Sequence, residues 1–128
     1  MHTRTMSKVF IRRLNSFSHA LRGMGLLVRT QANARVHLLA AGLVCIAGIY
    51  CGLSRAEWLW IVAAIVWVWG AEAFNTALEQ LADAVHPERH PGIGRAKDAA
   101  AAAVLIAAVG AAIIGVLVFA PHLATLWQ

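Results

Sequence analysis

The segment VWVWGAEAFNTALEQLADAV, residues 66–85, carries side chains whose types and spacing could do chemistry. It begins as an apolar helix and then places Glu72, Asn75, Glu79 and Asp83 close together, although the chain has only six acidic residues. At about 100° per residue, these four side chains fall within an arc of roughly 80° on one helical face. The spacing therefore predicts a polar stripe along one side of an otherwise apolar helix.

Such a stripe is costly inside a membrane. A single acidic side chain at the bilayer centre costs about 2.5–3.5 kcal/mol on insertion scales. Several acids on one face therefore indicate a compensating partner, which could be a metal ion, a basic group or a water-filled site. A polar seam between helices, to which Asn75 and Thr76 could belong, is the structural alternative.

A second polar segment, GIGRAKD at residues 92–98, lies just beyond the stripe. Its glycines precede Arg95, Lys97 and Asp98 near an expected helix start, where backbone N–H groups and a lysine suit phosphate. Carboxylates on one helical face suit Mg²⁺, which binds few protein oxygens and otherwise uses water and phosphates. Neither a Walker A motif nor a Rossmann fingerprint is present in the sequence. The two segments together predict phosphoryl transfer at a membrane surface.

The composition indicates the elements that must position these residues. Of the 128 residues, 60% are hydrophobic and only 13% are charged, and the long apolar runs are typical of membrane spans. We predict an all-α integral membrane protein with a single domain. This domain is expected to cover residues 1–128. Its expected parts are a basic segment at 1–15, an amphipathic surface helix at 16–36, and transmembrane helices at 37–53, 57–85 and 97–120.

Local patterns support two of these expectations. Five apolar residues share one face of the 16–36 helix at i, i+3, i+4, i+7 and i+11, which is typical of a helix lying in the headgroup layer. They are Phe17, Ala20, Leu21, Met24 and Val28. Between the first two spans, Ser54 can cap the next helix, and Glu57 occupies the capping-box position.

The basic residues indicate an orientation. Seven of the eleven Lys and Arg residues precede the first span, and three more lie at 89–97, after the second span. Because Lys and Arg remain in the cytoplasm, the N-terminus and the second loop are expected there. The net charge of +5 therefore indicates membrane topology, and we expect no nucleic-acid partner.

The two motifs resemble a known family. EAFNTALEQLADAV followed by RAKDAAAAAVLIAA is similar to the signature of the small prokaryotic diacylglycerol kinase and undecaprenol kinase family. ARVHLLAA and GLSRAEW resemble the undecaprenol kinase branch more closely, and the similarity extends over residues 12–120. The resemblance implies a lipid kinase of the cell inner membrane that uses ATP and Mg²⁺. It also implies a homotrimer with sites between neighbouring subunits.

The resemblance also implies roles for individual residues. Glu72 would be the general base, Asn75 would support it, and Glu79 would bind the metal. The expected nucleotide-binding residues are Arg12, His19, Gln31, Glu79, Glu88, His90, Lys97 and Asp98. The expected substrate-binding residues are Arg12, Glu72 and Asn75. Gln31 departs from the family pattern, in which a glutamate at this position supplies a second metal ligand. The side-chain carbonyl of Gln31 could ligate Mg²⁺ but brings no charge.

Alternatives remain open from the sequence alone. Glu88 and His90 could be solvated loop residues, and His19 a solvated side chain of a surface helix. A non-catalytic family member or an acid-lined, cation- or proton-conducting membrane oligomer would share the polar stripe. The acceptor lipid also stays open between undecaprenol and diacylglycerol, because each offers a primary hydroxyl on a long apolar tail.

Overall fold

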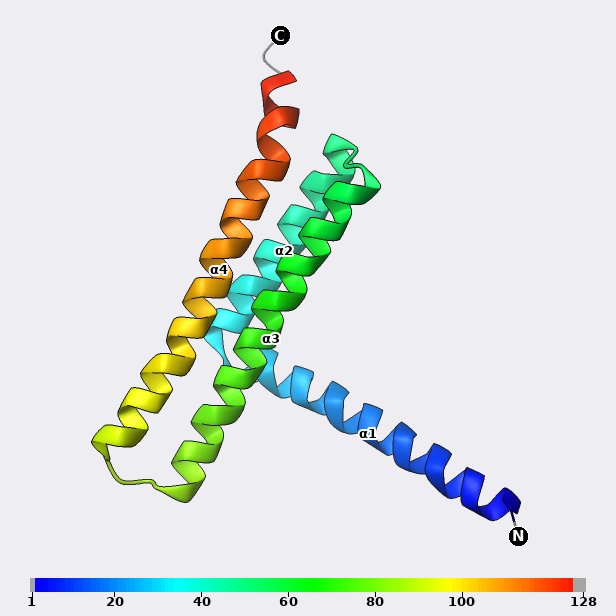
Figure 1. Cartoon of the computed structure of the whole chain (residues 1–128), viewed down its shortest axis with the longest axis vertical. Helices are drawn as coiled ribbons and strands as arrows, with labels where there is room; N and C mark the ends of the chain where they lie inside the picture. Colours follow the sequence, from blue (N-terminus) through cyan, green and yellow to red (C-terminus); the bar gives the residue numbers. More distant parts are fainter. Residues whose placement is uncertain (1, 126–128) are drawn as a thin grey trace.

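Four helices form the chain in the computed structural model, which describes residues 2–125 and the side chains of residues 13 and 15–124. The helices are α1 (His2–Thr30), α2 (Ala32–Cys51), α3 (Arg55–Val85) and α4 (Pro91–Thr125). Helices α2, α3 and α4 run alongside one another, whereas α1 leaves this bundle and extends away from it (Figure 1). The longest packed pair is the α3–α4 hairpin, which extends beyond the start of α2 (Figure 1).

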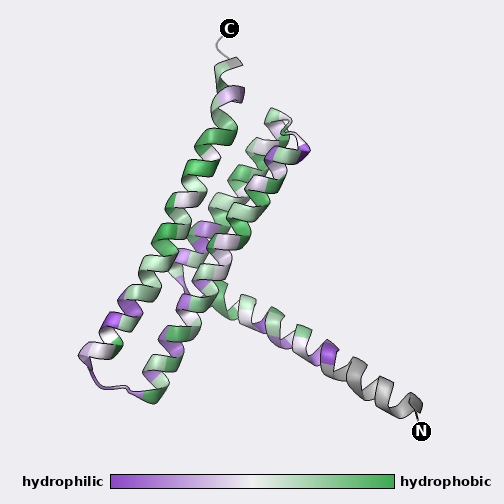
Figure 2. Ribbon diagram, in the orientation of Figure 1, coloured by the Kyte–Doolittle hydropathy of each residue, from purple (hydrophilic) through white to green (hydrophobic). Residues whose placement is uncertain are grey.

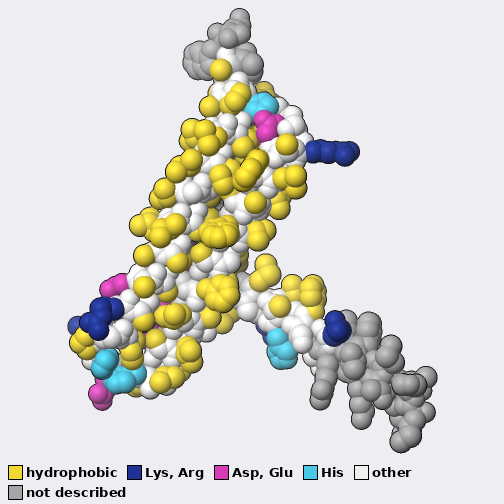
Figure 3. All heavy atoms as spheres, in the orientation of Figure 1, with side chains coloured by type: hydrophobic (Ala, Val, Ile, Leu, Met, Phe, Trp, Pro, Cys, Tyr) yellow, Lys and Arg dark blue, Asp and Glu magenta, His cyan; other side chains and the backbone are white. Residues whose placement is uncertain are grey.

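Three of the described helices are long and apolar enough to cross a membrane. They are Ala32–Cys51, Arg55–Val85 and Pro91–Ala124. Apolar residues predominate along α2, α3 and α4 (Figure 2). Apolar side chains cover most of the visible face of the bundle, and charged groups gather at its two ends (Figure 3). A surface of this kind matches hydrocarbon, because a helix that is hydrophobic all round is a buried or membrane helix. The prediction of an all-α fold with three helices long and apolar enough to span a membrane is therefore confirmed.

The tight turn between α2 and α3, residues 52–54, defines what we call the turn end of the bundle. Gly52 has φ 68° and ψ 44°, a left-handed conformation that glycine adopts without a Cβ penalty. Its N–H donates to the Ile49 carbonyl, and the Leu53 N–H donates to the Gly48 carbonyl, so two carbonyls of the last turn of α2 are satisfied. The Ser54–Glu57 capping box then starts α3, as predicted.

The opposite end of the hairpin, residues 86–90, defines the loop end. α4 begins at Pro91, six residues before the predicted start at 97. Proline is well suited to the first helical position, because it lacks an N–H that would find no partner there. The His90 ring accepts a hydrogen bond from the Gly92 N–H through Nδ1 at 3.1 Å, so the glycines lie in the first turn of α4 rather than in a loop.

A single extended residue separates α1 from α2. Gln31 has φ −102° and ψ 119°, so the chain changes direction there, and α2 starts at Ala32 instead of at the predicted 37. The hydroxyl of Thr30 donates to the Leu26 carbonyl at 2.9 Å at the end of α1. Residues 32–36 extend α2 because a helix can continue into polar sequence beyond its apolar run. The predicted surface helix 16–36 is thus divided, and α1 also includes residues expected in the basic segment 1–15.

Gly48 allows the closest approach at the turn end. It is buried in α2, and a Cβ placed there would lie 2.9 Å from the outer ring of Trp58 and 3.0 Å from Leu53. Leu53 belongs to the buried apolar cluster with Ile61 and Val118. A larger residue at position 48 would therefore push against this cluster.

We expect Gly48→Leu to lower the melting temperature of the purified protein by several degrees, because the new side chain must displace Trp58. Gly42→Leu is the matched control on the same helix, since a Cβ at Gly42 meets nothing within 4 Å. The control should melt at or above the wild-type temperature, because Leu favours helix more than Gly does. Equal effects of both substitutions would contradict the packing described here.

Candidate functional site

Glu72 lies about midway along α3 and is almost completely buried, with 2% of its surface exposed. Its Oε1 lies 3.3 Å from Nε2 of His37, on the second turn of α2. This is an ion-pair distance, although the angle is not that of a hydrogen bond. The described chain therefore holds a carboxylate among apolar helices with one basic side chain beside it.

Three buried side-chain atoms near Glu72 have no hydrogen-bond partner within the described residues. They are Oε1 of Glu72, Oδ1 of Asn75 and Oγ1 of Thr76. Buried polar groups are nearly always paired, so each exception needs an explanation. Because all three lie on little more than one turn of α3, a polar ligand beside this turn would explain them together. A polar seam between helices would instead have paired these atoms with each other or with α4.

Glu79 follows two turns after Glu72, about 10 Å nearer the loop end at a rise of about 1.5 Å per residue. The amide of Asn75 donates from Nδ2 to Oε1 of Glu79 at 3.2 Å. Asn75 thus contacts one predicted site residue directly and lies one turn from the other. The stripe predicted from the sequence is a continuous polar strip of α3 that leads from Glu72 toward the loop.

The loop end carries Lys97 and a pocket beside it. Lys97 donates from Nζ to Oδ1 of Asp83 at 2.7 Å, which ties the second turn of α4 to the last turns of α3. Both residues line a shallow pocket of about 420 Å³ together with Glu88 and His90. The pocket therefore unites three residues predicted for nucleotide binding, namely Lys97, Glu88 and His90.

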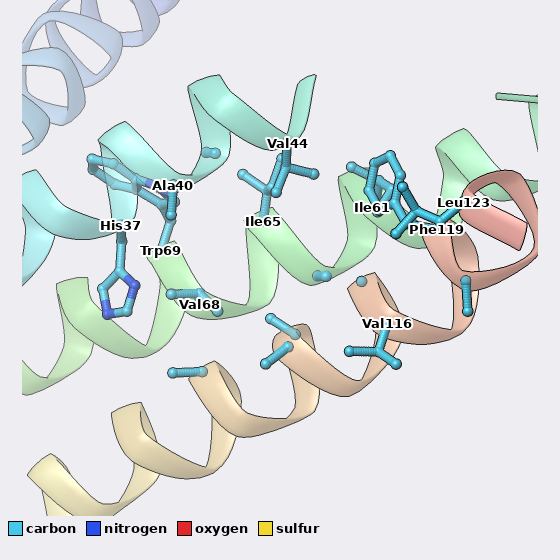
Figure 4. Close-up of a pocket in the computed structure, with 17 residues that line it drawn as sticks. His37, Ala40, Val44, Ile61, Ile65, Val68, Trp69, Val116, Phe119 and Leu123 are labelled. Carbon is cyan, nitrogen blue, oxygen red and sulfur yellow. The ribbon is translucent and has the colours of Figure 1, made fainter. Parts of the chain in front are cut away.

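An apolar groove of about 580 Å³ runs between α2, α3 and α4 toward the turn end. Its walls come from small and apolar residues such as Ala40, Val68 and Val116. His37 lies at one end of the groove and Phe119 and Leu123 near the other, with the imidazole ring pointing into the groove (Figure 4). The groove thus begins at the side chain that contacts Glu72.

Other predicted residues lie apart from this cluster. His19 is exposed on α1, where its Nδ1 is 3.1 Å from a guanidinium nitrogen of Arg22. Gln31 is half-buried at the break between α1 and α2. Asp98 is exposed on α4, and the side chain of Arg12 lies outside the described residues. Because α1 extends away from the bundle, a single chain does not bring His19 to the loop-end pocket (Figure 1).

Two further residues belong to the site although sequence reasoning gave them no catalytic or binding role. They are His37, which contacts Glu72, and Thr76, whose hydroxyl is buried beside it. The sequence predicts Asp83 in the stripe, but not its contact with Lys97. Thr76 could have been found from the helical spacing that identified the stripe. His37 could not, because its contact joins two helices at positions far apart in the chain.

The donor set indicates what kind of metal ion could bind. Among the described side chains, those of residues 13 and 15–124, no group of three from His, Cys, Asp or Glu is close enough to hold a metal ion. A metal cage made only of protein groups is therefore not built by the described part of one chain. The Glu79 carboxylate with the neighbouring unpartnered amide oxygen of Asn75 does fit Mg²⁺ that takes most of its ligands from phosphates and water.

Comparison with known proteins decides the family. The sequence profile described as "Prokaryotic diacylglycerol kinase" matches residues 18–119, which include the whole polar strip and the loop end. The chain belongs to the prokaryotic diacylglycerol kinase family. Membership makes it a lipid kinase of a prokaryotic membrane-protein family and confirms the resemblance seen in the motifs.

Relatives of this kinase carry two different names. It is 43% identical over 108 residues to the undecaprenol kinase of Bacillus subtilis, covering 84% of this chain and 88% of that one. It is 28% identical over 94 residues to a diacylglycerol kinase of Haemophilus influenzae, covering 73% and 80% of the two chains. A diacylglycerol kinase of Synechocystis is 32% identical over 114 residues, covering 88% and 65%.

The burial of Glu72 leads to a prediction about stability. Glu72→Gln removes a costly buried carboxyl group while keeping its shape, so we expect an unchanged or raised melting temperature. Val68→Gln, one turn earlier and also buried, puts the same amide into the apolar part of α3 and should lower the melting temperature. If Glu72→Gln destabilised the protein as much as Val68→Gln does, Glu72 would have a structural role instead.

Proposed function

We propose that this protein phosphorylates the hydroxyl of a membrane lipid alcohol, using ATP and Mg²⁺, at the cytoplasmic surface of the inner membrane. The observation that carries the proposal is the buried Glu72 carboxylate. It contacts His37, which lines the apolar groove, and it begins the polar strip of α3 that leads to Asp83, the partner of Lys97. A lipid and a soluble phosphate donor would approach such a site from opposite sides. Family membership supports the same reaction class.

The charge distribution supports the orientation. The loop end carries Arg89, Arg95 and Lys97, whereas the turn 52–54 is followed by Arg55 alone. Because basic residues favour the cytoplasmic side, the loop end and the N-terminus would face the cytoplasm. The polar strip of α3, with Lys97 beside its last residue Asp83, would then face the side where ATP is available.

The proposed reaction is a direct transfer. The lipid hydroxyl oxygen forms a bond to the γ-phosphorus of ATP, the bond from that phosphorus to the bridging oxygen of ADP breaks, and the hydroxyl proton passes to Glu72. Glu72 suits this role because it is buried at a depth that the hydroxyl of a membrane-embedded alcohol can reach. Asn75, one turn away on α3, would support the site beside Glu72.

The phosphates would lie toward the loop end. Lys97 is an ammonium donor held in place by Asp83, and it could neutralise charge on the transferred group. Glu79, steadied by Asn75, would hold Mg²⁺, which supplies charge neutralisation at the phosphates when bound. The remaining nucleotide contacts would come from Glu88, His90 and Asp98.

A homotrimer would explain the residues that lie apart. His19 on α1 and Gln31 at the α1–α2 break are separated from the loop-end pocket of their own chain. We propose that α1 lies along the membrane surface and brings these residues, with Arg12, to the pocket of a neighbouring copy. The exposed apolar faces of α2 and α4 are available for contacts with lipid and with such neighbours.

Undecaprenol is the acceptor that we favour, because the undecaprenol kinase relative shares more of the sequence than the diacylglycerol kinases do. The test offers undecaprenol and diacylglycerol side by side to purified protein in mixed micelles with ATP and Mg²⁺. We expect phosphorylated undecaprenol as the main product. No phosphorylated lipid from either acceptor would contradict the proposal, and a preference for diacylglycerol would correct the acceptor.

Two substitutions separate the proposed roles of the acids. Glu72→Gln should abolish turnover while leaving ATP binding nearly unchanged, since only the proton acceptor is lost. Glu79→Gln should instead weaken the affinity for Mg·ATP. Binding and turnover are measured on both variants, and the roles would have to be reassigned if Glu72→Gln mainly weakened binding or Glu79→Gln left it normal.

Gln31 permits a test of the metal site. Gln31→Glu adds a carboxylate at the position where the family pattern has one, so half-maximal activity should require less Mg²⁺. Gln80→Glu, an exposed change on α3 that adds the same charge, serves as the control and should leave the Mg²⁺ requirement unchanged. An unchanged or increased requirement in Gln31→Glu would argue against placing this residue at the metal.

A further inference from the structure

We infer that His37 is a positioning residue for Glu72: its imidazole, which lines the end of the apolar groove, fixes the orientation of the carboxylate. The inference rests on the kinase reaction proposed above, and it assigns a role to a residue that has none so far. Its basis is the short distance between His37 Nε2 and Glu72 Oε1, the burial of Glu72 with the partial burial of His37, and the location of the ring in the groove.

The contact is enclosed by apolar structure. The Glu72 side chain is 3% exposed and that of His37 is 22% exposed. On α2, His37 is the titratable side chain beside the Glu72 carboxylate, and on α3 the nearest acidic residue is Glu79, two turns away. The α4 residues that line the same groove, such as Ala108 and Ala111, are apolar. Among the described side chains, His37 is therefore the group that could hold the carboxylate by attraction.

The geometry suits positioning better than neutralisation. At 3.3 Å from Oε1, Nε2 of His37 would limit the rotation of the carboxylate by contact and attraction, while Oε2 stays available to a substrate. A lysine or arginine would bring a permanent charge into the apolar region and would hold the carboxylate as an ion pair, making it a poorer base. An imidazole can orient the base without a fixed charge.

The backbone also supports a defined role. His37 lies close to the start of α2, whose position is set by the break at Gln31 and by the fully buried Ala34. This part of α2 is therefore anchored against the rest of the bundle, and the ring does not lie on a mobile end. At the turn end, His122 makes another His–Glu pair, a hydrogen bond with Glu57 at 2.9 Å, far from the proposed chemistry.

The experiment compares His37→Leu with His37→Gln in the mixed-micelle assay. His37→Leu removes the polar nitrogen beside Oε1 and should lower kcat at least about tenfold, because a misplaced catalytic group is costly. The KM for Mg·ATP should stay unchanged, since His37 lies away from the loop-end pocket. His37→Gln, whose amide keeps a polar nitrogen on this side chain, should recover most of kcat.

His122→Leu is the matched control, because it removes the other His–Glu pair of the described chain. It should leave kcat unchanged, whatever it does to the melting temperature, which is measured for every variant. Wild-type kcat in His37→Leu would overturn the inference, and so would a loss in His37→Leu that His37→Gln does not reverse. Turnover retained in Glu72→Gln but lost in His37→Leu would make His37 the base and would also overturn it.

A second readout does not depend on catalysis. In protein labelled with ¹⁵N-histidine, Glu72→Gln should shift the imidazole resonances of His37, identified by their loss in His37→Leu, and leave those of His122 unchanged. Unshifted His37 resonances would overturn the contact itself. A wild-type protein that shows this coupling but phosphorylates no lipid would instead refute the proposed function, and with it the role of His37 in that function.

Discussion

The burial of the Glu72 carboxylate is the constraint on which the rest of this structure depends. A carboxylate in the middle of a membrane helix is unfavourable, and hydrogen bonds within the described chain do not remove the cost, since Oε1 has no such partner. Proteins retain groups of this kind where function requires them. Three features keep this carboxylate between hydrocarbon and the pocket at the loop end. They are the apolar spans, the polar strip of α3 and the position of α2.

The different lengths of the helices create that boundary. α2 has 20 residues, whereas α3 and α4 have 31 and 35, so the hairpin extends past the start of α2 at the loop end (Figure 1). Glu72 lies where α2 still covers α3, through His37, while Glu79 and Asp83 lie farther toward the loop. Side-chain burial therefore decreases along the polar strip of α3, from Glu72, which is buried, through Glu79 to the exposed Asp83. The buried end suits a base that meets a lipid, and the exposed end suits ions and phosphates.

The sequence predicts much of this arrangement, and physical reasons explain what it misses. Uninterrupted apolar runs predict the three spans, and the helical repeat predicts the strip from Glu72 to Asp83. The starts of α2 and α4 are missed because a helix continues into polar sequence while its residues tolerate helical geometry, as at Arg35, or when proline begins it, as at Pro91. The His37–Glu72 contact depends on how two distant helices pack, and nothing in the local pattern of either segment indicates that pairing.

The central claim is that the acceptor reaches Glu72 from the apolar phase. Surface dilution tests it most directly: the initial rate is measured at constant bulk concentration of undecaprenol while added detergent lowers its mole fraction in the micelles. The rate should fall with the mole fraction, because the enzyme samples the lipid within its own micelle. A rate that follows bulk concentration alone, with a short-chain water-soluble alcohol used equally well, would contradict it.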